Sequence, residues 1–408
     1  MQICPPDKCT GCYACVNTCH FKCISMQENE YGELHPVIDE AHCTHCNLCF
    51  KSCPNNIELE FNYPSSCYAS WITDTQKRKI CASGGIGTIL SEFVIKQKKG
   101  VVFGSRYDKQ FTPIITYTEQ IEELEYFKGS RYVQSIVGDG TLLKVKDFLK
   151  SGRFVLFIGT PCQIAGLKSF LHKDYNNLIV VDLICHGVCP NKYFKEEVAY
   201  VCKKKRIKRL VDVRFRGNDR KNFCLSFWTG KRTGKSRCVY NKSAYTQYYF
   251  AGFLLGVSLR ENCYQCNYAR PERISDITIG DFIGLGKDIP FNYSKSNVSS
   301  VTLNTPKGTE FYQEVSQDTD ILINIQREYS ERLKYKPSLI EPSHKHELNP
   351  LFREQVLKVG YLKAIRLTLN EVVTKQKIRN IINYWRYIYR IPRKAIQVIV
   401  KNKFYQYG

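Results

Sequence analysis

Residues 9–19 read CTGCYACVNTC, and residues 43–54 read CTHCNLCFKSCP. Each stretch has three cysteines separated from one another by two residues, and a fourth cysteine that follows after three further residues. Three thiolates at this spacing can wrap a tight loop around one iron–sulfur cube, whereas the fourth lies where the chain turns away and reaches the other cube. The spacing therefore predicts two 4Fe-4S clusters, one held by Cys9, Cys12, Cys15 and Cys53 and the other by Cys43, Cys46, Cys49 and Cys19.

Zinc is the alternative metal for closely spaced cysteines. Structural zinc sites use two separated Cys-x-x-Cys pairs, not two triplets that each have an outlying fourth cysteine. The spacing therefore favours iron–sulfur clusters. His42 and His45 flank the second triplet, and we expect both to be ordinary loop residues because eight cysteines already complete two sites.

A predicted hairpin separates the two cysteine stretches. Residues 24–26 and 34–39 alternate apolar and polar side chains on either side of Gly32, which is typical of two short paired strands. With this repeat of cysteine loop and strand, residues 1–60 resemble a bacterial dicluster ferredoxin. The first half departs from that family at His20, where proline is usual, and we expect this change to shift the potential of the nearby cluster rather than abolish the cluster.

Composition narrows the class of protein. Twenty cysteines in 408 residues, with no export signal at the start, indicate metal binding in a reducing cytoplasm rather than disulfides. No apolar run is long enough to cross a membrane. The formal charge is +22, yet residues 1–60 carry only three lysines against eight acidic residues. An acidic head and a strongly basic body predict an acidic protein, an anionic substrate or a membrane surface as partner.

The chain after residue 60 has the pattern of a mixed α/β domain. Buried strands are predicted at residues 101–104, 154–158 and 178–184, and a helix is predicted at residues 118–127. Strands that end in small residues before a helix suggest a partly parallel sheet with functional groups at its carboxyl edge. Ser83-Gly84-Gly85 opens a further helix, whose first N–H groups could hold a phosphate; a close-packed turn is an equal interpretation.

Six short motifs follow one another in this body. They are Ser83-Gly84-Gly85, Lys128-Gly129-Ser130, GTPCQIAGL at residues 159–167, DLICHG at residues 182–187, CYQC at residues 263–266 and DITIGDF at residues 276–282. In this order they resemble the beta-subunit family of coenzyme F420 (deazaflavin) hydrogenases and dehydrogenases. The resemblance covers most of residues 65–340.

The resemblance implies a flavoprotein that binds FAD beside iron–sulfur clusters and passes electrons between a hydride carrier and one-electron centres. Bacterial members occur in surface-polysaccharide gene neighbourhoods, so that metabolism is an expected context. This chain departs from the family at Cys81-Ala82, Ile86-Gly87 and Ile283, and the deazaflavin itself is confined to certain organisms. The motif residues expected to bind the cofactor are Ser83, Gly84, Gly85, Lys128, Ser130, Thr160, Gln163 and Asp281.

His186 is the candidate catalytic residue. It follows a cysteine at a strand end, where it could supply a proton during hydride chemistry. Histidine in such a turn is at least as often a simple hydrogen-bonding residue.

Four cysteines outside the head fall within the motifs: Cys162, Cys185, Cys263 and Cys266. Two end neighbouring predicted strands and two form a Cys-x-x-Cys turn, so their number and placement suit a third 4Fe-4S cluster. One alternative is that Cys162 and Cys185 are ordinary buried cysteines. A zinc site on the same four thiols is another.

The predicted fold class combines a ferredoxin-like domain at residues 1–60, a mixed α/β flavin-binding body at residues 61–345 and a basic helical tail at residues 346–408. In the tail, Ile378, Ile381, Ile382, Trp385 and Ile388 recur at helical spacing with Arg379, Arg386 and Arg390 between them, and Pro392 breaks the pattern. Such a helix predicts contact with an anionic membrane surface; packing on the body or on a partner subunit is the alternative.

The function predicted from these features is that of a cytoplasmic iron–sulfur flavoenzyme, free or peripheral to the inner membrane surface, with a redox partner protein or a small-molecule substrate. A non-catalytic electron-transfer subunit is the first rival. Nucleic-acid binding is a weaker one, because the basic residues match no nucleic-acid-binding module.

Overall fold

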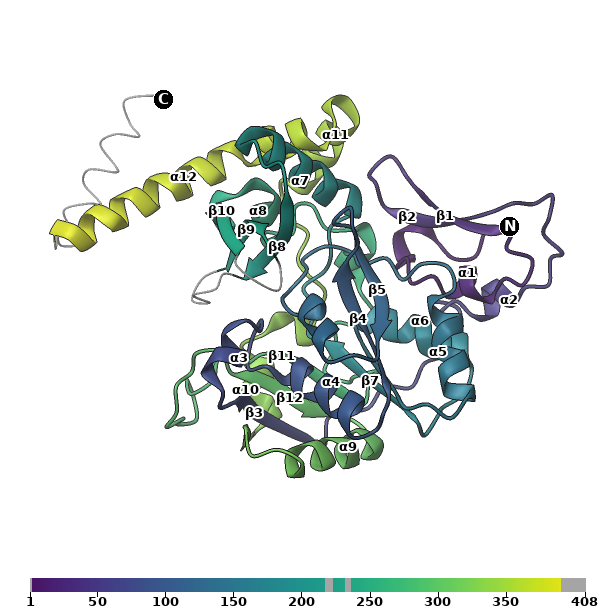
Figure 1. Cartoon of the computed structure of the whole chain (residues 1–408). Coiled ribbons are helices and arrows are strands. Elements are labelled where there is room, and N and C mark those ends of the chain that lie inside the picture. Colours follow the sequence, from purple (N-terminus) through teal and green to yellow (C-terminus); the bar gives the residue numbers. More distant parts are fainter. Residues whose placement is uncertain (1, 217–222, 232–235, 390–408) are drawn as a thin grey trace.

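The computed structural model describes residues 2–216, 223–231 and 236–389, and Figure 1 shows how they are arranged. An eight-stranded sheet forms the centre of the body, in the order β13-β3-β12-β11-β7-β6-β4-β5. Strands β4, β6, β7 and β11 run parallel, and the others pair antiparallel. The predicted mixed α/β body is therefore confirmed. The strands are β3 (Ser66–Ile72), β4 (Val101–Tyr107), β5 (Pro113–Thr118), β6 (Val155–Gly159), β7 (Leu178–Leu183), β11 (Ile277–Asp281), β12 (Ser299–Leu303) and β13 (Leu322–Arg327).

Alternate side chains of the central strands enter two different cores. In β6, Val155 and Phe157 belong to one core and Leu156 to the other, as the two-residue period of a strand requires. Helices α4 (Ile86–Lys96) and α9 (Pro306–Gln317) cover the Leu156 face. Helices α5 (Thr141–Lys150) and α6 (Pro161–Leu171) cover the other face.

The amino-terminal head packs on the face covered by α5 and α6. Its strands β1 (Ile24–Glu28) and β2 (Leu34–Ile38) form the predicted hairpin, with Ile24 opposite Ile38. The short helices η1 (Pro6–Lys8), α1 (Ala14–Thr18) and α2 (Leu48–Lys51) complete the head. Apolar residues of the head share one core with residues of α5 and α6, so the head is docked on the body along a common apolar interface.

A second, antiparallel sheet contains β8 (Leu210–Arg216), β9 (Phe223–Gly230) and β10 (Ser236–Ser243). It packs with α7 (Asn191–Lys205), α8 (Tyr248–Leu254), α11 (Asn349–Val359) and the first half of α12 (Tyr361–Tyr389). Residues 349–373, which we expected in a separate tail, therefore contribute to a core of the body.

The rest of α12 projects away from the body in Figure 1. Ile378, Ile381 and Trp385 of the predicted apolar stripe are 38%, 57% and 48% exposed. The side chain of Ile388, together with Arg390 and Pro392, lies outside the described residues. Across the described part of the chain, no helix is both long enough and apolar enough to span a membrane.

The helix predicted at residues 118–127 is present only in its second part, and as a 3-10 helix. Strand β5 runs up to Thr118, and only a 3-10 helix, η2 (Glu122–Phe127), follows. Thr118, the first residue of the predicted helix, instead pairs with β4 at the edge of the sheet. The remaining elements are α3 (Thr75–Lys79), α10 (Tyr329–Lys334), η3 (Ala244–Thr246), η4 (Glu261–Gln265) and η5 (Pro337–Leu339).

Glu33 ties the head to the body and makes stability depend on pH. Its carboxylate accepts hydrogen bonds from Arg353 of α11 and from the backbone N–H of Glu261, each at 3.1 Å. Burial alone would raise the pKa of Glu33, but His35, Arg260 and Arg353 outweigh it and lower this pKa to about 2. A carboxyl whose pKa is depressed on folding adds stability above its unfolded pKa and loses it as the pH falls.

We expect Glu33→Gln to lower the free energy of unfolding at pH 7 by on the order of 3 kcal/mol. The deficit should shrink as the pH falls from about 4.5 toward 2, because the parent then loses the same charge. Urea unfolding of parent and variant at pH 7 and pH 3 measures it. Glu354→Gln, which removes an exposed ion pair with Lys358 on α11, is the control and should change little. An unchanged difference between the two pH values would contradict the prediction.

Candidate iron–sulfur and cofactor sites

One cavity of about 310 Å³ in the head is lined by the four predicted ligands Cys9, Cys12, Cys15 and Cys53, and also by Cys4. Cys53 comes from the second stretch, so the structure groups the thiols as the spacing predicts. The Arg260 guanidinium is fully buried and donates hydrogen bonds to the carbonyls of Cys9 and Leu34, at 3.0 and 3.2 Å. A hydrogen bond from Cys4, assisted by His35 and Arg260 and opposed by burial, lowers the pKa of Cys9 to about 4. This environment favours thiolate.

The second group of the head lies nearer to the surface. Cys19 follows α1 directly, and Cys46 in the second loop is exposed. Burial, followed by the charges of Cys46 and Cys19, raises the pKa of Cys49. Cys19 therefore sits with the second triplet, again as predicted, and α1 spans the distance between the two groups because Cys15 lies within it.

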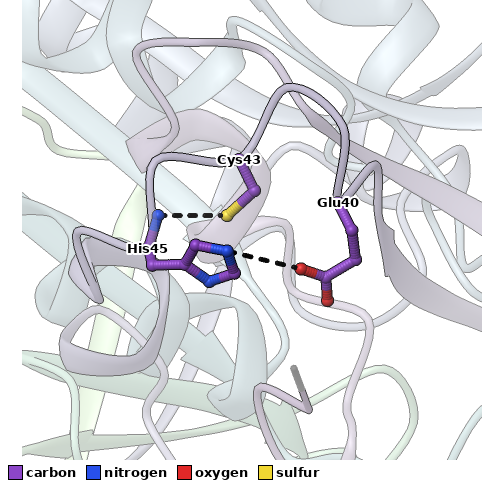
Figure 2. A group of neighbouring side chains, drawn as sticks. All are labelled: Glu40, Cys43 and His45. Atoms are coloured by element: carbon purple, nitrogen blue, oxygen red, sulfur yellow. Dashed lines mark hydrogen bonds and ion pairs between the residues drawn. The ribbon is translucent and has the colours of Figure 1, made fainter.

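Figure 2 shows a further feature of the second loop, in which Glu40, Cys43 and His45 turn toward one another. The His45 backbone N–H donates to Cys43 Sγ at 3.4 Å, and His45 Nε2 lies 3.9 Å from Glu40 Oε2. Their possible ligand atoms lie within 4.8 Å of one another. His45 is largely exposed in its loop, and its expected role as an ordinary loop residue stays a prediction. Because Cys43 would be shared, a separate ion here would compete with the cluster.

Two cysteines outside the predicted ligand sets also contact the head sites. Cys23 Sγ lies 3.3 Å from Cys19 Sγ. Cys4 lines the first cavity, where hydrogen bonds with Cys53 and then Cys9 raise its pKa. Neither belongs to the repeated spacing, so no sequence pattern distinguishes them from structural cysteines.

The four motif cysteines of the body also converge. Cys162 lies in the first turn of α6, Cys185 follows β7, Cys263 lies in η4, and Cys266 caps its end. Burial and then the charges of Cys185, Cys266 and Cys162 raise the pKa of Cys263. Burial, Cys162 and Cys266 likewise raise the pKa of Cys185 to about 12. The four thiols therefore lie within electrostatic range of one another, which isolated apolar cysteines would not.

The first head site and this third group are neighbours. Gly166 lies about one turn after Cys162 on α6, and a Cβ at Gly166 would stand 2.6 Å from Cys12 Cβ. Tyr268 is 6% exposed, and burial followed by the charges of Cys162, Cys12, Cys266 and Cys53 raises its pKa. Tyr268 therefore lies close to both groups of thiols.

Arg216, at the end of β8, joins several predicted cofactor residues. Its Nη2 donates to both carboxylate oxygens of Asp281 at 3.0 Å and to the carbonyl of Ala82 at 2.7 Å. Burial raises the pKa of Tyr132 although hydrogen bonds with Ser130 and Arg216 lower it. No motif marked Arg216 in the sequence; its partners lie far away in the chain.

A basic hollow of about 480 Å³ opens beside Arg216. Lys128, Ser130, Arg131 and Arg214 also line it. Arg216 Nη1 is buried and has no hydrogen-bond partner among the described residues. The positive charge of its lining suits a phosphate group, although Lys128 is itself paired with Glu125 at 2.9 Å.

The Ser83-Gly84-Gly85 turn is close-packed. The Gly84 N–H donates to Ser299 Oγ at 2.9 Å, and a Cβ at Gly84 would stand 2.3 Å from the Ser70 carbonyl oxygen. The Ser83 hydroxyl donates to the carbonyl of Val298 at 3.2 Å. These contacts give the turn a packing role, and the N-cap of α4 at Gly85 follows directly.

Thr160, Gln163 and His186 also have partners within the protein. Thr160 and Gln163 form a capping box at the start of α6, and Gln163 Nε2 donates to the Ser135 carbonyl at 3.0 Å. His186 Nε2 lies 3.3 Å from the Phe253 carbonyl oxygen, and Nδ1 lies 3.2 Å from Ser343 Oγ. Burial lowers the pKa of His186. The geometry fits a neutral, hydrogen-bonded histidine, and its catalytic role stays a prediction.

Comparison with protein families agrees with this architecture. Residues 8–57 match the 4Fe-4S dicluster domain, and residues 152–326 match the C terminus of the coenzyme F420 hydrogenase/dehydrogenase beta subunit. The chain thus combines a 4Fe-4S dicluster domain with a region similar to the C terminus of the coenzyme F420 hydrogenase/dehydrogenase beta subunit. The resemblance drawn from the six motifs and from the cysteine repeat is confirmed.

The chain is also similar to a solved structure. It is a chain of the F420-reducing [NiFe] hydrogenase complex from Methanosarcina barkeri, with 16% sequence identity and a TM-score of 0.39. The match covers 77% of this chain and 95% of that chain. No curated protein matches the chain.

Proposed function

We propose that this chain is an iron–sulfur flavoprotein oxidoreductase that passes electrons between 4Fe-4S clusters, FAD and a hydride-type donor or acceptor. The supporting observation is the succession of sites through the molecule. Helix α1 spans the two head sites, and Tyr268 lies close to the first head site and the third thiol group. Lys336 senses both Cys185 of that group and Asp281 beside Arg216.

The donor sets fit iron–sulfur clusters. The dicluster match supports two clusters in the head, and we propose the ligands Cys9, Cys12, Cys15 and Cys53 for one and Cys43, Cys46, Cys49 and Cys19 for the other. We propose a third cluster at Cys162, Cys185, Cys263 and Cys266. Four thiols are the usual ligand set of a 4Fe-4S cube, and these four interact electrostatically. Arg260 supplies a buried positive charge beside the Cys9 group.

The basic hollow fits the phosphates of FAD, because Arg216 Nη1 is buried without a partner among the described residues. Lys128 and Ser130 line the hollow and would hold the cofactor there, and Asp281 would take part by positioning Arg216. A bound flavin exchanges electrons singly or in pairs and so connects one-electron centres with hydride chemistry. The other predicted cofactor residues would only position this region, because they pack and form hydrogen bonds within the protein. They are Ser83, Gly84, Gly85, Thr160 and Gln163.

A non-catalytic electron-transfer subunit is the second candidate. Both ring nitrogens of His186 already face protein partners, which favours a body without its own proton-transfer residue. A redox partner would then dock at the surface of the head, where Phe21 and Phe50 of α2 are 57% and 45% exposed. Adding NADH or another hydride donor to the isolated protein separates the candidates, because only the enzyme would bleach the cluster absorbance. Membrane contact through α12 and a role in surface-polysaccharide metabolism remain expectations.

The decisive experiment is flavin and iron analysis of the full chain purified without oxygen. We expect about one flavin per chain, and we expect Arg216→Gln to weaken flavin binding tenfold or more, because a charge-assisted hydrogen bond contributes about 1.5–3 kcal/mol. Fluorescence titration with FAD measures the change. Arg237→Gln, at an exposed position of β10 in the same small sheet, should bind like the parent. Iron-loaded parent that neither contains nor binds flavin would contradict the proposed function.

A further inference from the structure

Arg332 of α10 is a buried cation that lacks an ion-pair partner in the described part of the chain. It is 1% exposed, and its Nε and Nη1 have no hydrogen-bond partner there. The two other most deeply buried arginines are well bonded. Arg260 donates to Gln134 and to two carbonyls, and Arg273 pairs with Asp182 at 2.6 Å. A guanidinium keeps its charge in proteins, and burial of an unpaired charge is strongly unfavourable.

Lys336 lies just beyond the end of α10 and adds a second cation. Burial and then the charge of Arg332 lower the pKa of Lys336, against the opposite effect of Asp281 and Cys185. Among the described residues the Lys336 ammonium has no ion pair within 4.0 Å, whereas Lys334, on the last turn of α10, pairs with Asp288 at 3.0 Å. Arg332 and Lys336 therefore lie in one region that carries excess positive charge.

The nearby groups do not neutralise this charge. The charge of Asp281 acts on both cations, but its carboxylate is already paired with Arg216. Burial raises the pKa of Cys67 to about 12, so this thiol is neutral at pH 7. Glu331 pairs with Arg327 and accepts from the Gly286 N–H. Three cations and one carboxylate leave room for an added negative charge.

We propose that Arg332 and Lys336 form a buried anion site, beside Asp281 and Cys185, for a negatively charged group of the two-electron cofactor or substrate. The site rests on the proposed function, because Asp281 and Cys185 belong to the proposed flavin and third-cluster sites. Two groups share the required chemistry: a phosphate, and the ring of a reduced flavin. In either case the two cations favour the form of the ligand that carries more negative charge.

The test compares Arg332→Met with the parent, as full chains purified without oxygen and freed of flavin. Without ligand, we expect the variant to unfold at the same temperature as the parent or higher, because an unpaired buried charge has been removed. With FAD, the parent's midpoint should rise clearly and that of the variant less, with FAD binding at least tenfold weaker. Lys336→Gln, at a half-buried position, should also weaken FAD binding. This second variant keeps the test decisive if Arg332→Met does not fold. Lys334→Gln is the matched control and should behave like the parent.

Three probes identify the anion. If reduced FAD and reduced riboflavin lose affinity equally in the variant, the site holds the flavin ring. If only FAD loses affinity, and inorganic pyrophosphate stabilises the parent but not the variant, it holds phosphate. Two results together would overturn the proposal. Arg332→Met would be less stable than the parent both with and without ligand, and Lys336→Gln would bind FAD and pyrophosphate as tightly as the parent.

The same probes separate this site from the proposed function. If the parent binds no flavin, the proposed function fails, and pyrophosphate then decides the anion site alone. Stabilisation of the parent by pyrophosphate that disappears in Lys336→Gln supports the site. Absence of stabilisation in the parent overturns it.

Discussion

Replacing Cys263 with serine is expected to lower the iron content of the protein from about twelve to about eight atoms per chain, because three 4Fe-4S cubes become two. Cys263 is buried and senses the charges of Cys185, Cys266 and Cys162, so its loss removes one corner of a four-thiol site. Iron and labile-sulfide analysis, with electron paramagnetic resonance of the reduced protein, measures the change. One spectroscopic centre should disappear and two should remain.

Cys202→Ser is the control for this prediction. Cys202 lies on α7, and burial is the sole influence that raises its pKa; the substitution should leave about twelve irons. A parent with about eight irons would show that the third site holds no cluster. Zinc in place of the missing iron would support the alternative that the same four thiols form a zinc site.

The spacing of cysteines predicted the head because it encodes local geometry. Three thiols at every third position share one loop wherever the loop is placed, and the outlying fourth must cross to the other loop. The structure accordingly places Cys53 with the first triplet and Cys19 with the second. The docking of the head on the body could not be predicted from this spacing, because Arg260, which bonds to the Cys9 carbonyl, belongs to a distant segment of the body.

The cofactor region was predicted less well because its interactions are long-range. The Ser83-Gly84-Gly85 turn reads equally as a phosphate loop or a packed turn until Ser70 and Ser299 are placed against it by the order of strands β3 and β12. Arg216, Arg332 and Lys336 belong to no motif, and their importance follows from burial and from partners, which one sequence does not show. The start of the helix predicted at residues 118–127 was misplaced for the same reason, because Thr118 pairs with Val102 of β4.

Gly166→Ala should damage the junction between the first head site and the third thiol group. An added Cβ would stand 2.6 Å from Cys12 Cβ and 2.9 Å from Cys12 Sγ, closer than real Cβ contacts allow. A flexible side chain could move aside, but Cys12 is a proposed cluster ligand fixed by metal on its far side and by the loop on the other. We expect a loss of about 1–3 kcal/mol in stability from overpacking, or release of the first cluster with about four irons.

The matched control is Gly87→Ala on α4, where an added Cβ meets Ile279 at 3.5 Å, an ordinary contact. Because alanine is the better helix former, this control should be neutral or more stable by about 0.5–1 kcal/mol. Thermal unfolding and iron analysis of both variants separate a general glycine effect from the specific contact with Cys12. If Gly166→Ala kept its stability, its iron and the rate at which electrons pass between head and body, α6 would not be the place where the two meet. Loss of stability or iron in Gly166→Ala alone would instead show that the head site and the body depend on this one close contact.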